Sequence, residues 1–417
     1  MIRNRTASIS FLLVTLLLDT LGIGLVIPVL PRLVASFVGG DVRSASGYYG
    51  VFIALYAVMQ FLFAPIIGGL SDRFGRRLVI LSSIAGAALD HVLLALSPNL
   101  AWLFVGRVIA GITGASFSAA NAYIADITPP EKRAQSFGLI GAAFGLGFII
   151  GPTIGGLVGG AHLRAPFFVA AGLNALNFLY GVFVLPESLP GDRRRVFSFA
   201  RANPLASLVN LRRHPIVLGL SGTLVCAYLA QQILQSIWPL YGDARFGWGP
   251  RDIGLSLTVV GVMSAFVQVV LVRALIPRIG ERRALAFGLV FSILGFIGFG
   301  LATQGWMMYA ILVPFALGGV AGPATQALIS ARVDPSEQGE LQGTLASMMS
   351  MTAIIGPLIA TWLFGYFTRG GGAPYVPGSP YFASAALNLC GLVLALRLFA
   401  RSPVDPPKGD VAVDVTP

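Results

Sequence analysis

The sequence has few of the residues that soluble proteins place on their surfaces and few that enzymes use for catalysis. Charged residues make up only 11% of the 417 residues, whereas a soluble globular protein carries about 25%. The chain has two cysteines and three histidines, and Cys226 and Cys390 suit neither a metal site nor a disulfide framework. No nucleophile–base pair and no metal-ligand cluster is evident. We therefore expect a protein that is not an enzyme, with no bound cofactor and no metal site.

Long apolar runs dominate the chain, which is 56% hydrophobic. Runs of roughly 20 apolar residues recur, and each is long enough to cross about 30 Å of hydrocarbon as a helix. The basic, then apolar N-terminus resembles a secretory signal, but no small-x-small cleavage site follows, so we predict the first membrane helix there. The sequence thus predicts an all-α membrane protein with twelve transmembrane helices, at residues 8–30, 47–69, 78–97, 100–124, 135–160, 165–185, 215–241, 252–275, 283–303, 305–329, 341–367 and 380–400.

The net charge of +11 comes from basic residues in the loops between the spans and does not indicate a nucleic-acid site. With twelve spans both termini lie on one side, and 21 of the 28 basic residues fall in the tails and loops of that side. Six fall in the opposite loops, and Arg107 lies within a span. Because basic residues accumulate in cytoplasmic loops, we predict both termini in the cytoplasm, in a multi-pass protein of the bacterial inner membrane. We expect the lipid bilayer, but no nucleic acid, as a partner.

The two halves of the chain repeat at a constant offset of 205 residues. Two parallel six-helix repeats, related by an axis along the membrane normal, bind substrates near the midplane between them. The matched positions include Arg73 and Arg278, Gly75 and Gly280, Pro130 and Pro335, and Gly151-Pro152 and Gly356-Pro357. We therefore predict two pseudo-symmetric six-helix bundles, residues 1–190 and 215–402, with a cytoplasmic linker at 191–214 and a tail at 403–417. This architecture resembles that of the major facilitator superfamily (MFS).

The first cytoplasmic loop reads "GGLSDRFGRR". A turn this short needs Gly75, which adopts a positive φ readily, and Asp72 can pair with nearby arginines or cap the next helix. A generic basic loop is the alternative. The stretch resembles the MFS loop signature G-x-x-x-D-R-x-G-R-R, whereas the second-half copy has Pro277 in place of the aspartate. The resemblance implies a cytoplasmic gate, formed by Gly68, Asp72, Arg73, Gly75, Arg76 and Arg77.

The fifth predicted helix has glycines at about one-turn intervals, from Gly141 to Gly159. Small residues let membrane helices pack closely, and close packing alone is one explanation of this pattern. The segment also resembles the antiporter motif of MFS exporters, G-x-x-x-G-P-x-x-G-G. Its second part here consists of Gly151, Pro152, Gly155 and Gly156. This resemblance favours export over import.

The fourth predicted helix has a polar and glycine-rich face. Residues Arg107, Gly111, Gly114, Ser118 and Asn121 are spaced so that all five share one side of a helix, which we expect to face the bundle interior or a cavity. The stretch "GRVIAGITG" resembles the MFS helix-four signature, whose arginine is implicated in proton transfer. The alternative is an arginine that reaches out to the periplasmic interface.

Asp19 and Asp90 are the only acidic residues in the interior of a predicted span. At 1.5 Å per residue they lie about 16 Å and 18 Å from the cytoplasmic ends of their helices. An aspartate near the bilayer centre costs about 2.5–3.5 kcal/mol on insertion scales, and such residues usually mark an ion, proton or substrate path. We predict a proton-coupling site of Asp19, Asp90 and Arg107. Carboxylates that only hydrogen-bond between helices are the alternative.

The stretch from Asp19 to Pro31 resembles the first-helix signature of twelve-span drug/proton antiporters, D-x-x-G-x-G-x-x-x-P-x-x-P. Further segments, including "GRVIAGITGASFSAANAYIADIT" and "QGELQGTLASM", look like bacterial tetracycline/proton antiporters over nearly the whole chain. Those antiporters carry a histidine in helix eight and an aspartate in helix nine, where this chain has Ser264 and Ser292. Coupling here would therefore rest on the first half.

Polar but uncharged side chains mark the candidate substrate cavity. Large aromatics and amides suit a planar, polar, drug-like molecule, although ordinary hydrogen bonding between helices also explains such residues. The predicted cavity residues are Asn121, Gln231, Gln235, Trp238, Gln268 and Gln326.

Taken together, the motifs predict a secondary active transporter that exports a small amphiphilic drug, of the tetracycline type, in exchange for protons. A tetracycline would travel as a chelate with a divalent metal, and the proton gradient would supply the energy. We expect a monomer. The alternatives are an MFS exporter of another drug or a native metabolite, less readily a sugar importer, and a non-transporting membrane sensor on the same fold.

Overall fold

The computed structural model describes residues 2–114, 116–129, 132–194, 215–334, 337–370 and 374–401. The predicted tail 403–417 and most of the predicted linker lie outside these ranges, so the domain boundaries stay a prediction. Throughout the described part the regular structure is helical, which confirms the all-α prediction. The first half contains α1 (Ile2–Val26), α2 (Leu30–Ser36), α3 (Val42–Phe74), α4 (Arg76–Leu96), α5 (Leu100–Thr113), α6 (Ser116–Ile127), α7 (Arg133–Ala161), α8 (Ala165–Val184) and η2 (Gly191–Arg193).

The second half repeats this pattern. Its elements are α9 (Pro215–Phe246), α10 (Pro250–Phe266), the π-helical η6 (Val267–Leu271), α11 (Val272–Ile279), α12 (Glu281–Leu301), α13 (Gly305–Leu317), η7 (Gly318–Val320), α14 (Ala321–Ser330), α15 (Gln338–Thr368) and α16 (Ser379–Arg401). Gly75 and Gly280, at the predicted repeat offset, have φ of +104° and +79° and open equivalent helices. The repeat is therefore present in backbone geometry as well as in sequence.

Ten helices of the described chain are long and apolar enough to cross a membrane, and the bent pair α1–α2 supplies another span. The bend of 46° falls at Pro28 and Pro31, which lack the N–H that a continuous helix needs. The remaining predicted span, 100–124, is divided into α5 and α6 after Gly114. Gln60 of α3 donates a hydrogen bond to the Gly114 carbonyl oxygen at 3.2 Å and so compensates for part of this break. Twelve spans therefore match the helices, although the first and fourth are not straight.

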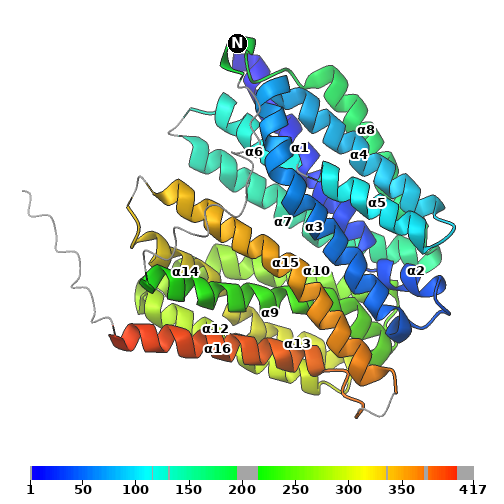
Figure 1. Cartoon of the computed structure of the whole chain (residues 1–417), viewed down its shortest axis with the longest axis vertical. Helices are drawn as coiled ribbons and strands as arrows, with labels where there is room; N and C mark the ends of the chain where they lie inside the picture. The colour runs from blue at the N-terminus through cyan, green and yellow to red at the C-terminus, as the bar shows by residue number, and fades with distance from the viewer. Residues whose placement is uncertain are drawn as a thin grey trace, which may run out of the picture.

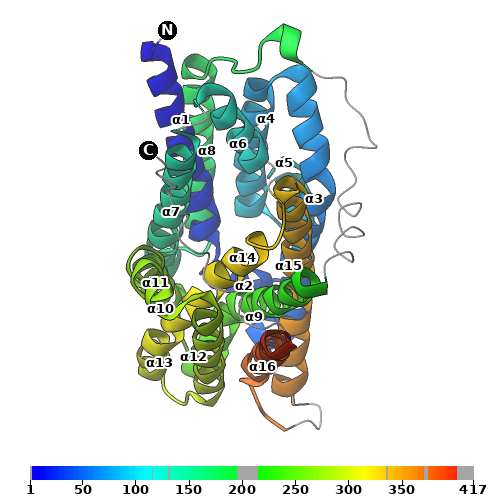
Figure 2. The ribbon, with the colours of Figure 1, turned by 90° about the vertical axis from the view of Figure 1, so that its left-hand side faces the viewer.

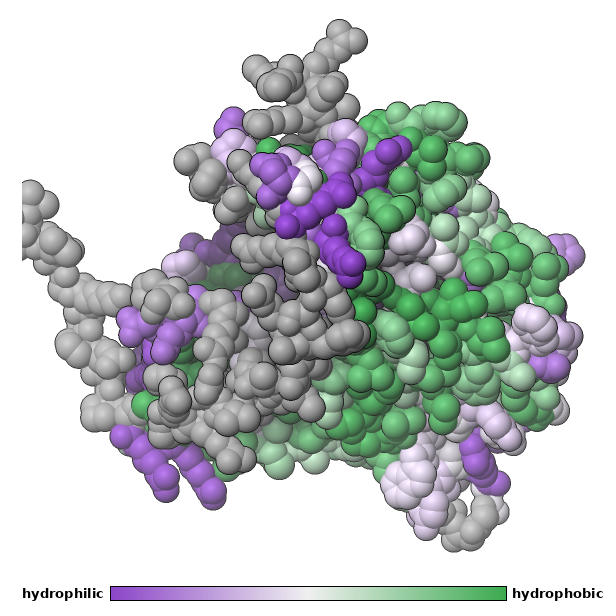
Figure 3. All heavy atoms as spheres, turned by 45° about the horizontal axis from the view of Figure 1, so that its top comes forward, coloured by the Kyte–Doolittle hydropathy of each residue, from purple (hydrophilic) through white to green (hydrophobic). Residues whose placement is uncertain are grey.

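The helices form two bundles, α1–α8 and α9–α16, which lie one above the other in Figure 1 and remain distinct in the turned view of Figure 2. Between the bundles, α3 packs against α15 and α7 packs against α10. A large apolar surface covers the helices, with hydrophilic side chains gathered towards the ends of the molecule (Figure 3). Exposed apolar residues such as Leu62, Leu176 and Phe183 contribute to it, as expected where lipid replaces water.

We call the end of the bundle where α1 begins and α16 ends the terminal face, and the opposite end the distal face. The turn between α3 and α4 at Gly75 lies at the terminal face. The turns between α2 and α3, between α9 and α10 and between α15 and α16 lie at the distal face. Asp19 lies midway along the 2–36 segment, as predicted, whereas Asp90 lies only six residues before the distal end of α4.

Candidate functional site

A buried ion pair joins α4 to α5. Arg107 Nη2 donates to Asp90 Oδ2, and the side chains are only 14% and 2% exposed. The guanidinium carbon of Arg107 also lies 5.1 Å and 5.8 Å from the ring centres of Phe52 and Tyr56 on α3, within the range of cation–π attraction. Arg107 therefore points into the bundle, and the alternative of an arginine reaching out to the interface is wrong. The structure brings two of the three predicted coupling residues together.

Tyr56 is a further polar residue beside this pair. The Tyr56 hydroxyl lies within range of electrostatic interaction with Arg107, Asp19 and Asp90, and Gln60 Nε2 donates to it at 3.4 Å. Asp19 itself is half-buried on α1. Tyr56 therefore lies beside the Arg107 guanidinium, and no sequence motif indicated this residue. A tyrosine and a glutamine four residues apart on an apolar helix were the signal that could have found it.

A second group of buried polar residues lies between α4, α1 and α8. The sequence motifs did not indicate it either. His91 is buried, with its Nδ1 2.7 Å from the Ala87 carbonyl oxygen. The His91 ring and the Asn174 amide are both so near Gly22 that a Cβ added there would contact them at 3.4 Å. Thr15 donates to the buried Asn177 at 3.2 Å. The position of His91 directly after Asp90, and of two asparagines in an otherwise apolar helix, were the available signals.

An ion network occupies the predicted loop at the terminal face. Arg76 lies 2.5 Å from Asp72, one turn earlier, and 3.3 Å from Asp126 on α6. Its Nη1 also donates to Ser71 Oγ at 2.7 Å. The predicted pairing of Asp72 with a nearby arginine is therefore present, and Asp126 is an additional member. Arg73 is exposed with its guanidinium over the Phe74 ring, and Gly68 lies within α3.

Glu187, rather than Asp72, caps the start of α4. Its carboxylate accepts hydrogen bonds from the backbone N–H of Arg76 at 2.8 Å and of Arg77 at 3.3 Å. The Gly75 backbone has φ +104°, and a Cβ there would lie 2.3 Å from Glu187 Oε2. Glycine is therefore required at this turn for its conformation and for the close approach of the carboxylate. The end of the first bundle is thereby attached to the predicted gate.

The predicted antiporter motif forms close contacts on both sides of α7. A Cβ on Gly151 would lie 2.8 Å from the Gly24 Cα of α1, and one on Gly155 would lie 2.2 Å from the Leu25 carbonyl oxygen. A Cβ on Gly156 would lie 2.9 Å from the Gly254 Cα of α10, in the other bundle. Close packing is thus present, as the packing explanation expected. Pro152 lies within α7 beside Gly24.

The predicted cavity residues fall in different surroundings. Asn121 and Gln231 are half-buried, and Gln235 and Gln268 are exposed. Gln326 donates to Gln342 at 3.2 Å. Trp238 is buried, donates to Ser256 Oγ at 2.9 Å and packs edge-on against Phe299. Trp238 is therefore part of the second bundle's core, and no contact among the described residues brings these six side chains together.

Polar contacts join the two bundles at the distal face. Arg32 Nε lies 2.5 Å from Asp243 Oδ2, and Arg32 Nη2 donates to the Trp248 carbonyl oxygen at 3.2 Å. Arg43 Nη2 donates to the Ala244 carbonyl oxygen at 3.4 Å. The predicted span 215–241 ends before Asp243, whereas α9 continues to Phe246 and includes this residue. From this end the helices of the two bundles diverge towards the terminal face (Figure 1).

Comparison with solved structures agrees with this fold. The human organic anion transporter MFSD10 (TETRAN) superposes with a TM-score of 0.68 at 24% identity, over 94% of this chain and 99% of that chain. A bacterial homologue of the human lysosomal transporter Spinster, in an inward-facing and unoccupied conformation, gives 0.74 at 17% identity, over 97% and 99%. At these identities the likeness shows the fold alone.

Comparison of sequences identifies the family. The model of the Major Facilitator Superfamily matches residues 12–271 and 220–414. The tetracycline resistance protein of class C from Escherichia coli is 45% identical over 84% of this chain and 88% of its own length. The class G protein from Vibrio anguillarum is 40% identical over 92% and 96%. These matches confirm the resemblance that the motifs predicted. The chain therefore belongs to the Major Facilitator Superfamily of membrane transporters, and it is a sequence relative of the tetracycline resistance proteins.

Proposed function

We propose that this protein exports a small amphiphilic drug of the tetracycline type across the bacterial inner membrane in exchange for protons. The observation that carries the proposal is the buried Asp90–Arg107 pair, together with the half-buried Asp19 on α1, inside a bundle otherwise built from apolar helices. Charge at this depth is costly and usually functional. The sequence relatives are tetracycline resistance proteins of bacteria, which supports the substrate class.

Asp19 is the principal proton-binding carboxylate in this proposal. Asp90 is held by Arg107 in a buried pair, so its charge is balanced within the pair. Asp19 is half-buried and lies at the middle of the first span. A proton that binds Asp19 changes the net charge near Tyr56 and Arg107. This change alters the free energy of the site when it contacts substrate relative to its free energy when it contacts solvent.

Alternating access uses contacts at the two faces. With the basic loops inside, the terminal face is cytoplasmic and the distal face periplasmic. The Arg32–Asp243 pair holds the periplasmic side closed in this state, and substrate enters from the cytoplasm. For release, that pair separates and the cytoplasmic gate around Asp72, Arg76 and Asp126 comes together with the other bundle. The protein acts as a monomer, since each chain contains both bundles.

The substrate site lies between the bundles. We place Asn121, Gln231, Gln235, Gln268 and Gln326 near it, as uncharged groups that hydrogen-bond a planar polar molecule. A tetracycline would arrive there as its chelate with a divalent metal. Ser264 is exposed on α10, and Ser292 packs beside Gly318, so neither position supplies a charge.

The absence of charge at Ser264 and Ser292 favours a second candidate, an MFS exporter of another drug or a native metabolite. Uptake of a substrate panel into everted membrane vesicles, driven by a proton gradient, separates the two. Tetracycline transport supports the first candidate. Transport of other drugs with no tetracycline signal supports the second.

The same vesicles test the coupling site. We expect Asp19→Asn to abolish proton release on substrate addition, because an amide does not exchange a proton. Asp192→Asn, which removes an exposed carboxylate in η2, is the matched control and should leave release intact. Substrate-induced proton release that persists in Asp19→Asn would show that the assignment is wrong.

A further inference from the structure

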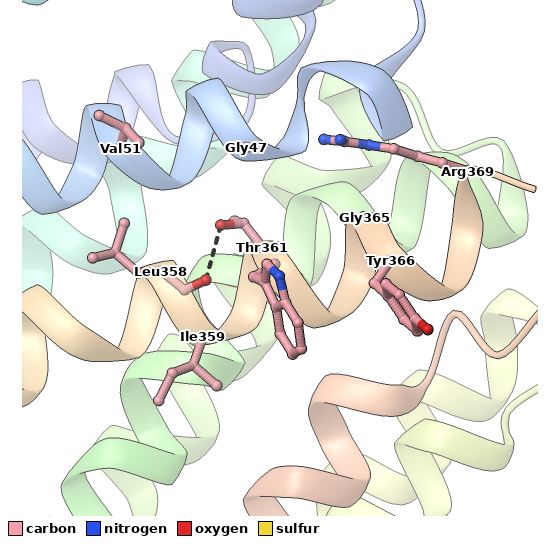
Figure 4. Close-up of a pocket in the computed structure, with 9 residues that line it drawn as sticks. Gly47, Val51, Leu358, Ile359, Thr361, Gly365, Tyr366 and Arg369 are labelled. Carbon is pink, nitrogen blue, oxygen red and sulfur yellow. Dashed lines mark hydrogen bonds between the residues drawn. The ribbon is translucent and has the colours of Figure 1, made fainter. Parts of the chain in front are cut away.

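A groove of about 710 Å³ lies between α3 and α15, in the distal half of the molecule (Figure 4). Its volume falls within the range typical of ligand pockets, about 300–1,000 Å³. The proposed transport cycle does not use this groove. The groove is lined by Gly47, Val51, Leu358, Ile359, Thr361, Trp362, Gly365, Tyr366 and Arg369.

The groove opens to the outside of the bundle at membrane depth. Trp362 is 64% exposed, Tyr366 57% and Val51 49%, although α3 and α15 are both membrane spans. Side chains that are exposed on a span and apolar contact lipid rather than water. The occupant available to this groove is therefore a component of the bilayer, with an acyl chain along the apolar lining.

The distal end of the groove carries positive charge. Arg369 Nε donates to the Arg43 carbonyl oxygen, and its Nη2 donates to the Ser44 carbonyl oxygen and to Ser46 Oγ, each at 3.2 Å. These bonds hold the guanidinium in place and leave its Nη1 group for another acceptor. The neighbouring Arg43 guanidinium lies over the Tyr375 ring at 5.7 Å. Within the described ranges, neither arginine forms an ion pair.

We propose that this groove binds an anionic phospholipid of the leaflet at the distal face, with its phosphate at Arg369 and one acyl chain along Val51, Leu358 and Trp362. A guanidinium and a phosphate form strong charge-assisted hydrogen bonds, and basic pockets between membrane helices bind lipid head groups. Tryptophan and tyrosine beside the groove suit the interfacial depth at which head group and chain meet. A positively charged drug is disfavoured by the two arginines.

Binding should also favour one conformation. Gly47 and Val51 belong to the first bundle, and the other lining residues belong to the second. The groove is therefore complete only while the bundles meet at the distal face, and a ligand that binds one state shifts the population towards it. This second step rests on the proposed alternating access, whereas the binding site itself does not.

Native mass spectrometry of the full-length protein, delipidated in detergent, tests the binding. We expect phosphatidylglycerol to bind more tightly than phosphatidylcholine with the same acyl chains. Arg369→Gln should weaken the affinity for phosphatidylglycerol by about fivefold, which is the contribution of one arginine near an anionic lipid surface. Val51→Trp should block the groove.

The controls are matched by position. Arg251→Gln removes another exposed arginine of the distal face, and Leu62→Trp enlarges a half-exposed residue three turns from Val51 on α3. Both should bind like the unaltered protein. Equal affinities for the two lipids, or equal losses in Arg369→Gln and Arg251→Gln, would overturn the site. Displacement of the bound lipid on addition of a transported drug, with no other lipid added, would also overturn the proposal, because the groove would then be a drug site.

Spin labels at Pro98 and Gln304, on opposite bundles at the distal face, test the conformational step in a variant without Cys226 and Cys390. Phosphatidylglycerol should shorten the distance distribution relative to phosphatidylcholine, and Arg369→Gln should remove that difference. Lipid binding with an unchanged distribution would refute the conformational preference while leaving the site in place. An Asp19→Asn variant that releases protons normally refutes the proposed coupling and does not affect either lipid result.

Discussion

Arg32 and Asp243 are 211 residues apart in the chain, yet Arg32 Nε lies 2.5 Å from an Asp243 carboxylate oxygen. The two residues belong to different bundles, on α2 and α9. Because this pair joins the bundles at the distal face, it must separate whenever that face opens. A substitution in this pair should therefore change the relative populations of the two access states.

We expect Asp243→Asn to shift that balance towards distal opening. The side chains are 39% and 17% exposed, and a partly exposed pair contributes about 0.5–1 kcal/mol. The population ratio should therefore change by about two- to fivefold, since 1.4 kcal/mol is a factor of ten. Spin-label distances between Pro98 and Gln304 measure this. Exchanging the charges, Arg32→Asp with Asp243→Arg, should restore part of the closed population, and identical distributions in all variants would contradict the prediction.

The Asp90–Arg107 pair should behave differently, because it is buried. Arg107→Leu leaves the Asp90 carboxylate without its cation, and breaking a buried pair from one side costs about 3–5 kcal/mol. Replacing both residues, as Asp90→Asn with Arg107→Leu, should cost less than the sum of the single variants. Thermal unfolding of the purified variants in one detergent measures the coupling. Additive losses would argue that the two side chains do not stabilise each other.

Glu187 should stabilise the start of α4 without contacting the transport site. Glu187→Ala removes the acceptor of two backbone N–H groups, and the loss of a helix cap costs about 1 kcal/mol. Hydrogen exchange at Arg76 and Arg77 should accelerate by about fivefold, and less in Glu187→Gln, which keeps one carbonyl oxygen. Asp192→Asn serves as the control. Unchanged protection at both amides would mean that Glu187 is not the cap.

The cap of α3 should depend on pH. Partial burial raises the pKa of Asp41, but hydrogen bonds from the backbone of Arg43 and from Ser44 lower it more, so the pKa lies below its ordinary value of 3.8. A carboxyl whose pKa is lower in the folded state stabilises that state above its unfolded pKa, and this contribution is lost as the pH falls through the folded pKa. Exchange at Arg43 and Ser44, corrected for intrinsic pH dependence, should accelerate below about pH 4. Asp41→Asn should show no such change; an equal acceleration in that variant would assign the effect to another group.

Much of the architecture follows from the sequence. Hydropathy located the spans, the offset of 205 residues located the repeat, and Gly75 was predicted to need a positive φ, which the structure has. These features are local: a run of apolar residues crosses a bilayer as a helix whatever its neighbours are, and a tight turn selects glycine by its own backbone geometry. Asp90 was assigned to the site because an acidic residue inside a span usually marks a path, and Arg107 because its stretch resembles the MFS helix-four signature.

Tertiary structure decided which side chains meet. Tyr56 with Arg107, Glu187 at the start of α4, and Arg32 with Asp243 are long-range contacts, and no periodicity within one helix specifies them. Each depends on how closely helices approach, and at α7 that approach is set by glycines facing α1 and α10. The sequence alone determined that charges lie inside the membrane and how many helices carry them. Only the packing of those helices decided their partners, because electrostatic and hydrogen-bond energies depend on distances of a few ångströms.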